Sequence, residues 1–143
     1  MVAIKRNKLT ELFWKVHAWC YRVSGGRLGA TAMGMPVLLL TTTGRRSGEP
    51  RTVALMYLPR GDDCVVIASN AGEPRHPAWW LNLERQPEAV VQRGSQIRKV
   101  RAREALGEER EGLWAEVIGI ESSYTTYEGR TSRRIPVVVL EPV

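Results

Sequence analysis

The pattern of apolar and polar positions divides the chain into a helical first part and a strand-rich remainder. Between residues 7 and 23, apolar side chains recur every three or four positions, which is the spacing of an amphipathic helix. A glycine-rich connector follows over residues 24–35, and after it the apolar runs become short and are separated by turn residues. The pattern predicts a first segment, 1–35, made of this helix and connector, and a barrel domain over 36–143.

The second part contains six strand-like runs and two helical ones. The predicted strands are 37–43, 51–58, 64–69, 89–93, 96–103 and 135–140, and the predicted helices are 77–85 and 108–118. The polar segment 119–134 is predicted to be a loop. Most consecutive strands are joined by short turns, which favours an antiparallel sheet, and about six strands suggest a closed or half-closed barrel with helices at its edges. The predicted fold class is therefore α+β, mainly β.

Composition places the chain among ordinary globular proteins, with 43% hydrophobic and 25% charged residues. No apolar run approaches the roughly 20 residues of a membrane span, and no signal-peptide core follows the N-terminus, so a cytoplasmic location is predicted. Basic residues flank the apolar stripe of the helix over 7–23. It would either pack on the domain or lie peripherally on an anionic membrane surface. Cys20 and Cys64 lack metal-like spacing and are predicted to be buried thiols.

A formal net charge of +6 and a pI near 9.8 favour anionic partners, whether nucleic acid, a membrane surface or a small polyanion. Nucleic acid is disfavoured because no strand interleaves basic residues with a series of aromatic ones. The sequence has no nucleophile elbow, no HExxH, no P-loop and no cluster suited to a metal. His17 and His76 are the only histidines, which disfavours a Ser-His-Asp site. Such a protein either binds a ligand or takes its chemistry from a cofactor.

Three arginines gather in the turn between the first two predicted strands. Arg45, Arg46 and Arg51 stand there with Ser47 and Gly48. Guanidinium groups and turn amides both favour phosphate or carboxylate oxygens. The turn is therefore either an anion receptor or an exposed hairpin whose arginines are merely solvated.

Three further places offer polar or aromatic groups. Ser69 and Asn70 end the third predicted strand and would hydrogen-bond a heterocycle. Residues 76–80 begin a helix with two indoles, which either belong to the core or line an aromatic ligand. Tyr124 and Tyr127, three residues apart on the predicted loop, are either surface tyrosines or phenolic proton donors.

Four segments carry a family resemblance. They are residues 39–51 (LLTTTGRRSGEPR), 68–72 (ASNAG), 76–83 (HPAWWLNL) and 130–140 (RTSRRIPVVVL). Together, and in this order, they resemble the deazaflavin-dependent nitroreductase family, whose members use coenzyme F420, an 8-hydroxy-5-deazaflavin with a phosphodiester and polyglutamate tail. The resemblance covers roughly residues 36–142. It implies a split β-barrel and an F420H2-dependent reductase.

The resemblance also implies roles for individual residues. The turn residues would hold the phosphodiester and glutamate tail, namely Arg45, Arg46, Ser47, Gly48 and Arg51. The residues that would border the deazaflavin ring are Ala54, Leu55, Met56, Tyr57, Ser69, Asn70, Ala78 and Trp79. Tyr124 and Tyr127 would face the substrate, and a tyrosine or water would complete protonation.

The activity implied is hydride transfer from reduced F420 to an activated double bond: a quinone, an enone such as an α,β-unsaturated ester or lactone, or a nitroaromatic. Nitroimidazole-reducing members tend to have tyrosine where Met56 stands and tryptophan near the position of Arg130. These departures leave nitroimidazole activation unsupported, while the cofactor site as a whole is intact. Two alternatives stay open at this point, an FMN-binding split-barrel oxidoreductase and a non-catalytic F420 carrier.

Overall fold

The computed structural model describes Lys15, residues 31–32 and residues 35–143. The predicted helix over 7–23 and most of the connector over 24–35 lie outside the described residues. The division into a first segment and a barrel domain therefore stays a prediction.

In the described part of the chain, eight strands make up the sheet. They are β1 (Thr31–Ala32), β2 (Met35–Thr43), β3 (Pro50–Met56), β4 (Leu58–Arg60), β5 (Asp63–Ile67), β6 (Glu88–Arg93), β7 (Gln96–Ala105) and β8 (Val137–Pro142). All six predicted strands are present, as β2, β3, β5, β6, β7 and β8. The two additional ones have only two and three residues, too few to show the alternation that identifies a strand in a sequence.

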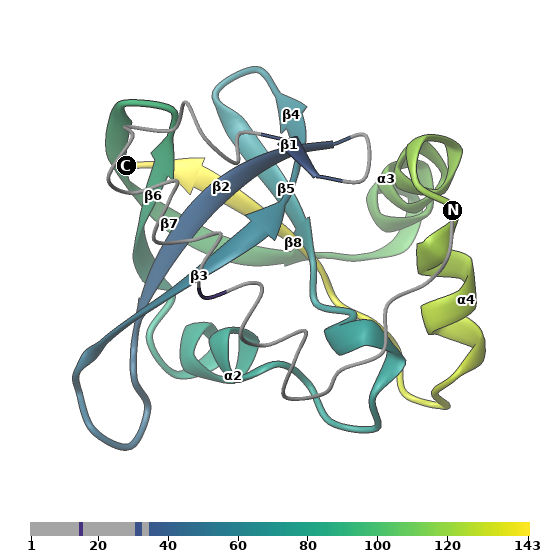
Figure 1. The fold of residues 1–143 in the computed structure, drawn as a ribbon, viewed down its shortest axis with the longest axis horizontal. Helices are drawn as coiled ribbons and strands as arrows, with labels where there is room; N and C mark the ends of the chain where they lie inside the picture. Colours follow the sequence, from purple (N-terminus) through teal and green to yellow (C-terminus); the bar gives the residue numbers. More distant parts are fainter. Residues whose placement is uncertain (1–14, 16–30, 33–34) are drawn as a thin grey trace.

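The sheet curls into a split barrel. All its pairings are antiparallel, in the order β1-β2-β6-β7-β8-β5-β4, and β3 pairs β2. Only Tyr57 separates β3 from β4, so one continuous segment pairs β2 at one end of the sheet and β5 at the other. That segment brings the two ends together, as Figure 1 shows. The predicted mainly-β barrel is confirmed.

The barrel interior is one of two main cores. Inward-facing side chains of β2, β5, β6, β7 and β8 meet there, and helix α2 (Ala78–Arg85) adds Trp79, Trp80 and Leu83. Cys64 is a buried free thiol in this core, as predicted. In Figure 1, α2 lies across the lower end of the barrel, beside the β2–β3 hairpin. Its apolar face therefore fixes the position of the helix relative to that hairpin.

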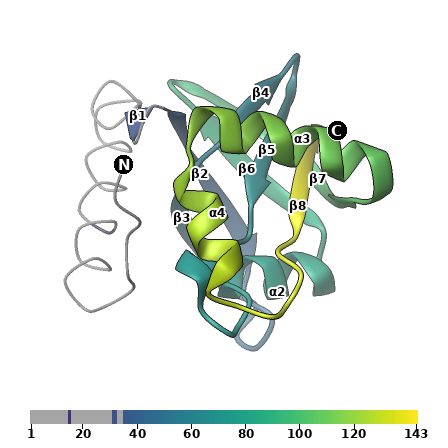
Figure 2. The same ribbon diagram turned by 90° about the vertical axis from the view of Figure 1, so that its right-hand side faces the viewer.

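The second core lies outside the barrel, between its wall and two helices. Helices α3 (Gly107–Ile120) and α4 (Ser123–Gly129) pack apolar side chains against the outward-facing residues of β5 and β8. Figure 2 shows both helices in front of these strands. The prediction of a loop over 119–134 was wrong for residues 123–129. Seven residues with two inward tyrosines are too short to display helical periodicity.

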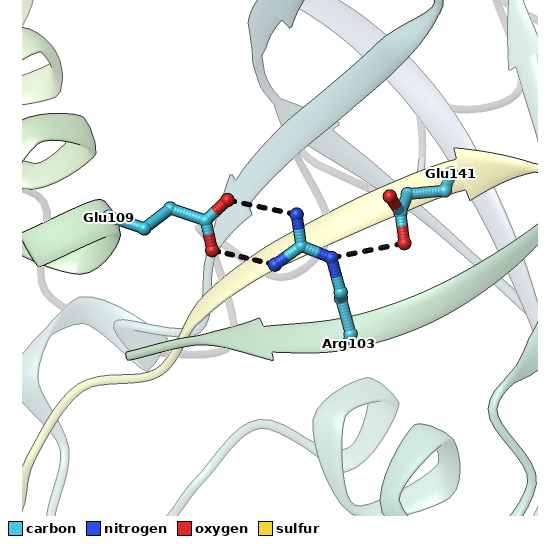
Figure 3. Close-up of polar contacts among 3 residues, drawn as sticks. All are labelled: Arg103, Glu109 and Glu141. Carbon is cyan, nitrogen blue, oxygen red and sulfur yellow. Dashed lines mark hydrogen bonds and ion pairs between the residues drawn. The ribbon is translucent and has the colours of Figure 1, made fainter. Parts of the chain in front are cut away.

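Arg103 of β7 links the start of α3 to the sheet by hydrogen bonds (Figure 3). Its Nη1 and Nη2 donate to the carboxylate of Glu109 at 2.6 and 2.9 Å, and its Nε donates to Glu141 of β8 at 3.0 Å. The hydrogen bond from Arg103 lowers the pKa of the Glu109 carboxyl. All three side chains are partly exposed, so this network orients α3 more than it stabilises the fold.

Candidate functional site

The β2–β3 hairpin presents its arginines on a tightly bonded turn. Thr42 pairs with Arg51, and beyond this pair Gly44 donates its N–H to the carbonyl of Glu49 at 2.8 Å. Gly48 donates back to the Gly44 carbonyl at 2.8 Å and has a φ of +72°, a left-handed value that glycine adopts without strain. The turn thus has a defined shape.

A buried asparagine holds this hairpin against α2. Both the N–H and the Nη1 of Arg45 donate to Asn82 Oδ1, at 3.1 and 3.2 Å, and Asn82 Nδ2 donates to Thr42 Oγ1 at 3.0 Å. Asn82 is only 3% exposed. The sequence analysis assigned it no role, although an asparagine between Trp79 and Leu83 on the buried face of a helix was the available signal. Asn82 fixes Arg45 while leaving its other guanidinium nitrogens available.

The other hydrogen-bond donors of the hairpin are not paired with a carboxylate of the described residues. Arg46 and Arg51 are exposed, and Arg51 Nη2 donates to Ser47 Oγ at 3.3 Å. Among the described residues, the N–H groups of Arg46 and Ser47 have no acceptor, and no carboxylate forms an ion pair with Arg45, Arg46 or Arg51. Guanidinium groups and unpaired turn amides at one place fit a phosphate or carboxylate ligand.

Strand β3 has an open edge that leads away from the arginines. Within the described part of the chain, β2 is the only strand that pairs β3. Tyr57 donates its N–H to the carbonyl of Pro36, so the antiparallel alternation directs the N–H and C=O groups of Thr52, Ala54 and Met56 to that open edge. These backbone groups are suited to hydrogen-bonding the edge of a heterocycle.

The four residues predicted to border the ring on β3 and just after it, residues 54–57, alternate between the two faces of the strand. Ala54 and Met56 pack with Val37 and Leu39 on the outer face of the barrel. Leu55 and Tyr57 face the barrel core instead, and the Tyr57 hydroxyl accepts a hydrogen bond from Arg93 at 3.2 Å. Of these four residues, only Ala54 and Met56 therefore present both backbone and side chain to a ligand on the outer side.

The loop after β5 carries an unusual asparagine. Asn70, at the start of the 3₁₀ turn η1 (Asn70–Gly72), has a φ of 49°, and Ala71 follows at 55°. Asn70 Nδ2 donates to the Arg75 carbonyl at 2.9 Å, whereas its Oδ1 is buried and has no partner among the residues that the structure describes. Buried amide oxygens are normally hydrogen-bonded, so an unpaired one is an acceptor suited to a ligand N–H or O–H. The preceding Ser69 is 8% exposed.

Tyr124 and Tyr127 lie on the inner face of α4, each 4% exposed. Their rings meet edge to face, with centroids 5.8 Å apart, and Met56 and Ala71 pack against the same cluster. Burial is the main cause that raises the pKa of the Tyr124 phenol above its usual value. The Tyr124 hydroxyl is protonated at neutral pH, as any tyrosine is, and its raised pKa makes it a hydrogen-bond donor more readily than a proton donor.

At the start of α2, Ala78 is exposed and Trp79 is buried in the barrel core. The site therefore extends along β3, with the arginine hairpin and Ala78 near one end and Met56, Asn70 and the tyrosines near the other. Five residue steps along the strand lead from Arg51 to Met56, a distance of about 17 Å. In Figure 1, β3 runs from the hairpin at lower left towards the side of the molecule on which α4 lies.

His76 gives this region a pH dependence. Arg133 Nη1 lies 3.1 Å from His76 Nδ1, and because arginine only donates, this nitrogen must accept. Burial first, and then Arg133, lower the pKa of His76. The unfolded chain takes up this proton near pH 6.5, before the folded one does. The histidine's contribution to stability is present above that pH and is lost as the pH falls below it.

We expect the melting temperature of the wild-type protein to fall more between pH 7.5 and pH 5 than that of His76→Gln, which cannot titrate. Thermal unfolding followed by circular dichroism at several pH values would measure the difference. Equal slopes for both proteins would contradict this reading of the Arg133–His76 contact.

The comparisons with known proteins agree with this geometry. A family profile described as F420H(2)-dependent quinone reductase matches residues 13–142. The chain is 38% identical over 130 residues to the F420H(2)-dependent quinone reductase of Mycobacterium tuberculosis strain H37Rv, covering 88% of this chain and 87% of that protein.

Solved structures are similar as well. One described as F420-H2 dependent reductase (FDR-A) has a TM-score of 0.68 and 38% identity, covering 74% of this chain and 94% of the other. Another, described as a domain-swapped dimer, has a TM-score of 0.70 and 33% identity, covering 94% of this chain and all of the other. The barrel, the profile match and these identities point to a single family.

Proposed function

This chain belongs to the F420H(2)-dependent quinone reductase family, and from that premise we propose that it reduces small quinones at the site along β3. The family makes the protein an oxidoreductase that depends on F420H2. The proposal concerns which residues bind the cofactor and which substrates are reduced.

The observation that carries the proposal is the arrangement of three chemically different places along one strand. A polyanionic tail fits Arg45, Arg46, Arg51 and the turn amides, where no carboxylate of the described residues forms an ion pair. The open backbone edge at Ala54 and Met56 and the unpaired Oδ1 of Asn70 fit a heterocycle that both donates and accepts. FMN, with one phosphate, would leave part of the arginine hairpin unused.

When bound, reduced F420 supplies a hydride, because a 5-deazaflavin carries carbon at the position of the flavin N5 and so favours two-electron transfer. The protein's contribution is binding and orientation. The hairpin would hold the tail, the β3 edge and Asn70 would orient the ring, and Ala78 would border it at the start of α2. The hydroxyl of Tyr124 or Tyr127 would donate a proton or hydrogen bond to the oxygen that becomes the hydroquinone hydroxyl.

The surroundings of the tyrosines favour flat, weakly polar substrates. Met56, Ala71 and the two rings form an apolar and aromatic environment, which suits a quinone and also an enone, a lactone or a nitroaromatic. No described helix has the combined length and apolarity needed to cross a bilayer. Peripheral contact through the basic helix predicted over 7–23, which would bring the site close to membrane quinones, stays part of the proposal, as does the cytoplasmic location.

Two measurements test the proposal together. Fluorescence titration with F420 and with FMN should show F420 binding at micromolar concentrations and weaker FMN binding. Anaerobic oxidation of F420H2 should then be followed with menadione, an enone and a nitroaromatic as acceptors, and menadione should give the highest kcat/KM. Tight F420 binding with no turnover on any acceptor would instead identify a carrier.

The tyrosine role is tested separately. Tyr124→Phe and Tyr127→Phe keep the aromatic packing, and at least one should lower kcat on menadione by about a hundredfold, within the range usual for proton donors. F420 affinity should stay unchanged in both. Full activity in both variants would leave water as the proton donor.

A further inference from the structure

Arg133 makes four contacts with the loop that follows β5. It lies between α4 and β8, about 60 residues further along the chain. Its guanidinium donates to Ser69 O at 2.8 Å (Nη2), Glu73 O at 3.1 Å (Nε) and Ala68 O at 3.3 Å (Nη1), and Nη1 contacts His76 Nδ1 at 3.1 Å. Among the described residues, no carboxylate pairs with Arg133. Backbone carbonyls take the place of a counter-ion.

The loop needs such support because its backbone is strained. Two successive non-glycine residues, Asn70 and Ala71, have positive φ values of 49° and 55°, in the left-handed region that asparagine adopts readily but alanine only at a steric cost. The loop's own bonds are short-range, from Gly72 N–H to Ser69 O at 2.9 Å and from Glu73 N–H to Asn70 O at 3.1 Å. Strain of this kind persists only where surrounding groups over-determine it.

Helix α4 and the residue after it support the same loop from the other side. Arg130 Nη1 donates to the carbonyl of Ala71 at 3.2 Å, and Gly72 lies so close to the Tyr127 carbonyl that a Cβ there would be 2.7 Å from its oxygen. The loop, α4 and Arg133 thus form one unit. Within it, Ala71 packs against the tyrosine cluster, and the buried Oδ1 of the preceding Asn70 has no partner among the described residues.

We infer that Arg133 is a positioning residue for the cofactor ring: it holds Ser69 and Asn70 in the conformation that receives the heterocycle, without touching the tail. This inference rests on the proposed function, in which these two residues border the deazaflavin. It separates ring recognition, set by Arg133, from tail recognition, set by the arginine hairpin.

The test uses two probes and a neighbouring control. The probes are complete F420 and its riboside, which has the ring but lacks the phosphate and glutamates. In Arg133→Gln the dissociation constants of both should rise at least tenfold, with the salt dependence of F420 binding unchanged. Arg134→Gln removes the adjacent exposed arginine, whose one ion pair among the described residues is with Glu104, and should bind both probes within twofold of wild type. Wild-type affinity of Arg133→Gln for the riboside would overturn the inference.

Amide hydrogen exchange keeps the test independent of activity. Exchange at Gly72 and Glu73 should accelerate at least tenfold in Arg133→Gln, while amides of α2 stay protected. Should this variant fail to fold, Arg133→Lys, whose single ammonium cannot reach all four acceptors, should show a smaller change in the same direction. Unchanged exchange in a folded variant would show that Arg133 does not hold this loop. If the wild-type protein binds neither probe, the proposed function fails. The exchange experiment still tests whether Arg133 holds the loop.

Discussion

Arg46→Gln should weaken F420 binding by about ten- to a hundredfold, the equivalent of losing one charge-assisted hydrogen bond of roughly 1.5–3 kcal/mol. Arg46 is the clearest test of the hairpin because it is exposed and forms no ion pair among the described residues. Its loss therefore removes a ligand contact without disturbing a structural one. Glutamine keeps a donor and much of the side-chain length, so the change isolates the charge.

Salt should reveal the electrostatic origin of this effect. Raising NaCl from 50 to 300 mM should weaken wild-type binding, because exposed charges are screened over a shorter distance, and the dependence should be shallower in Arg46→Gln. Fluorescence titrations at several salt concentrations would measure both slopes.

Arg98→Gln provides a control of equal charge. Arg98 follows the β6–β7 turn, at the end of the barrel opposite the arginine hairpin, and its one ion pair within the described part of the chain is a long one of 3.7 Å with Asp62. The affinity of Arg98→Gln for F420 and the salt dependence of that affinity should equal those of the wild-type protein. Binding by Arg46→Gln within twofold of wild type would mean that the tail lies elsewhere. Arg45→Gln should lose as much affinity or more, since it also breaks a contact with Asn82.

Local sequence patterns predicted the elements well, and with them the barrel. Strands such as β2 and β8 are long enough to show apolar runs between turns, and hairpin order then implies an antiparallel sheet. The arginine hairpin was visible because its residues are adjacent in the sequence. Helix α4 was missed because its seven residues hold too few apolar positions to display a period.

The finer geometry of the site depends on information that the local sequence does not contain. Residues 54–57 form one continuous motif, yet the period of two along a strand turns Leu55 and Tyr57 into the barrel and Met56 outward. Asn82 and Arg133 act on partners 37 to 65 residues away, through a side-chain oxygen and backbone carbonyls. Such contacts leave no periodic signature, so the fold is needed to identify the partners of these two residues.

Gly72→Ala should be the most damaging small substitution in the site. Gly72 has a φ of +77°, and an added Cβ would lie 2.7 Å from the Tyr127 carbonyl oxygen and 2.8 Å from Arg130 Cβ. The left-handed backbone costs an alanine about 1–2 kcal/mol, and relieving the overlap adds about 1–3 kcal/mol. We expect the melting temperature to fall by roughly 6–15 °C, at about 3 °C per kcal/mol for a chain of this size.

Gly61→Ala separates these two causes. Gly61 has a φ of +60° but nothing within 4 Å of its added Cβ. Its alanine variant is therefore destabilised only by the left-handed backbone conformation. The excess loss in Gly72→Ala over Gly61→Ala therefore measures how tightly the loop is packed on α4. Because the overlap is with the backbone of Tyr127, relief must displace either the loop or the tyrosines. Menadione reduction, assayed at a temperature where both variants are folded, should consequently fall in Gly72→Ala and remain at the wild-type rate in Gly61→Ala. Equal stability and equal activity of the two variants would show that the loop and α4 are not packed as a unit.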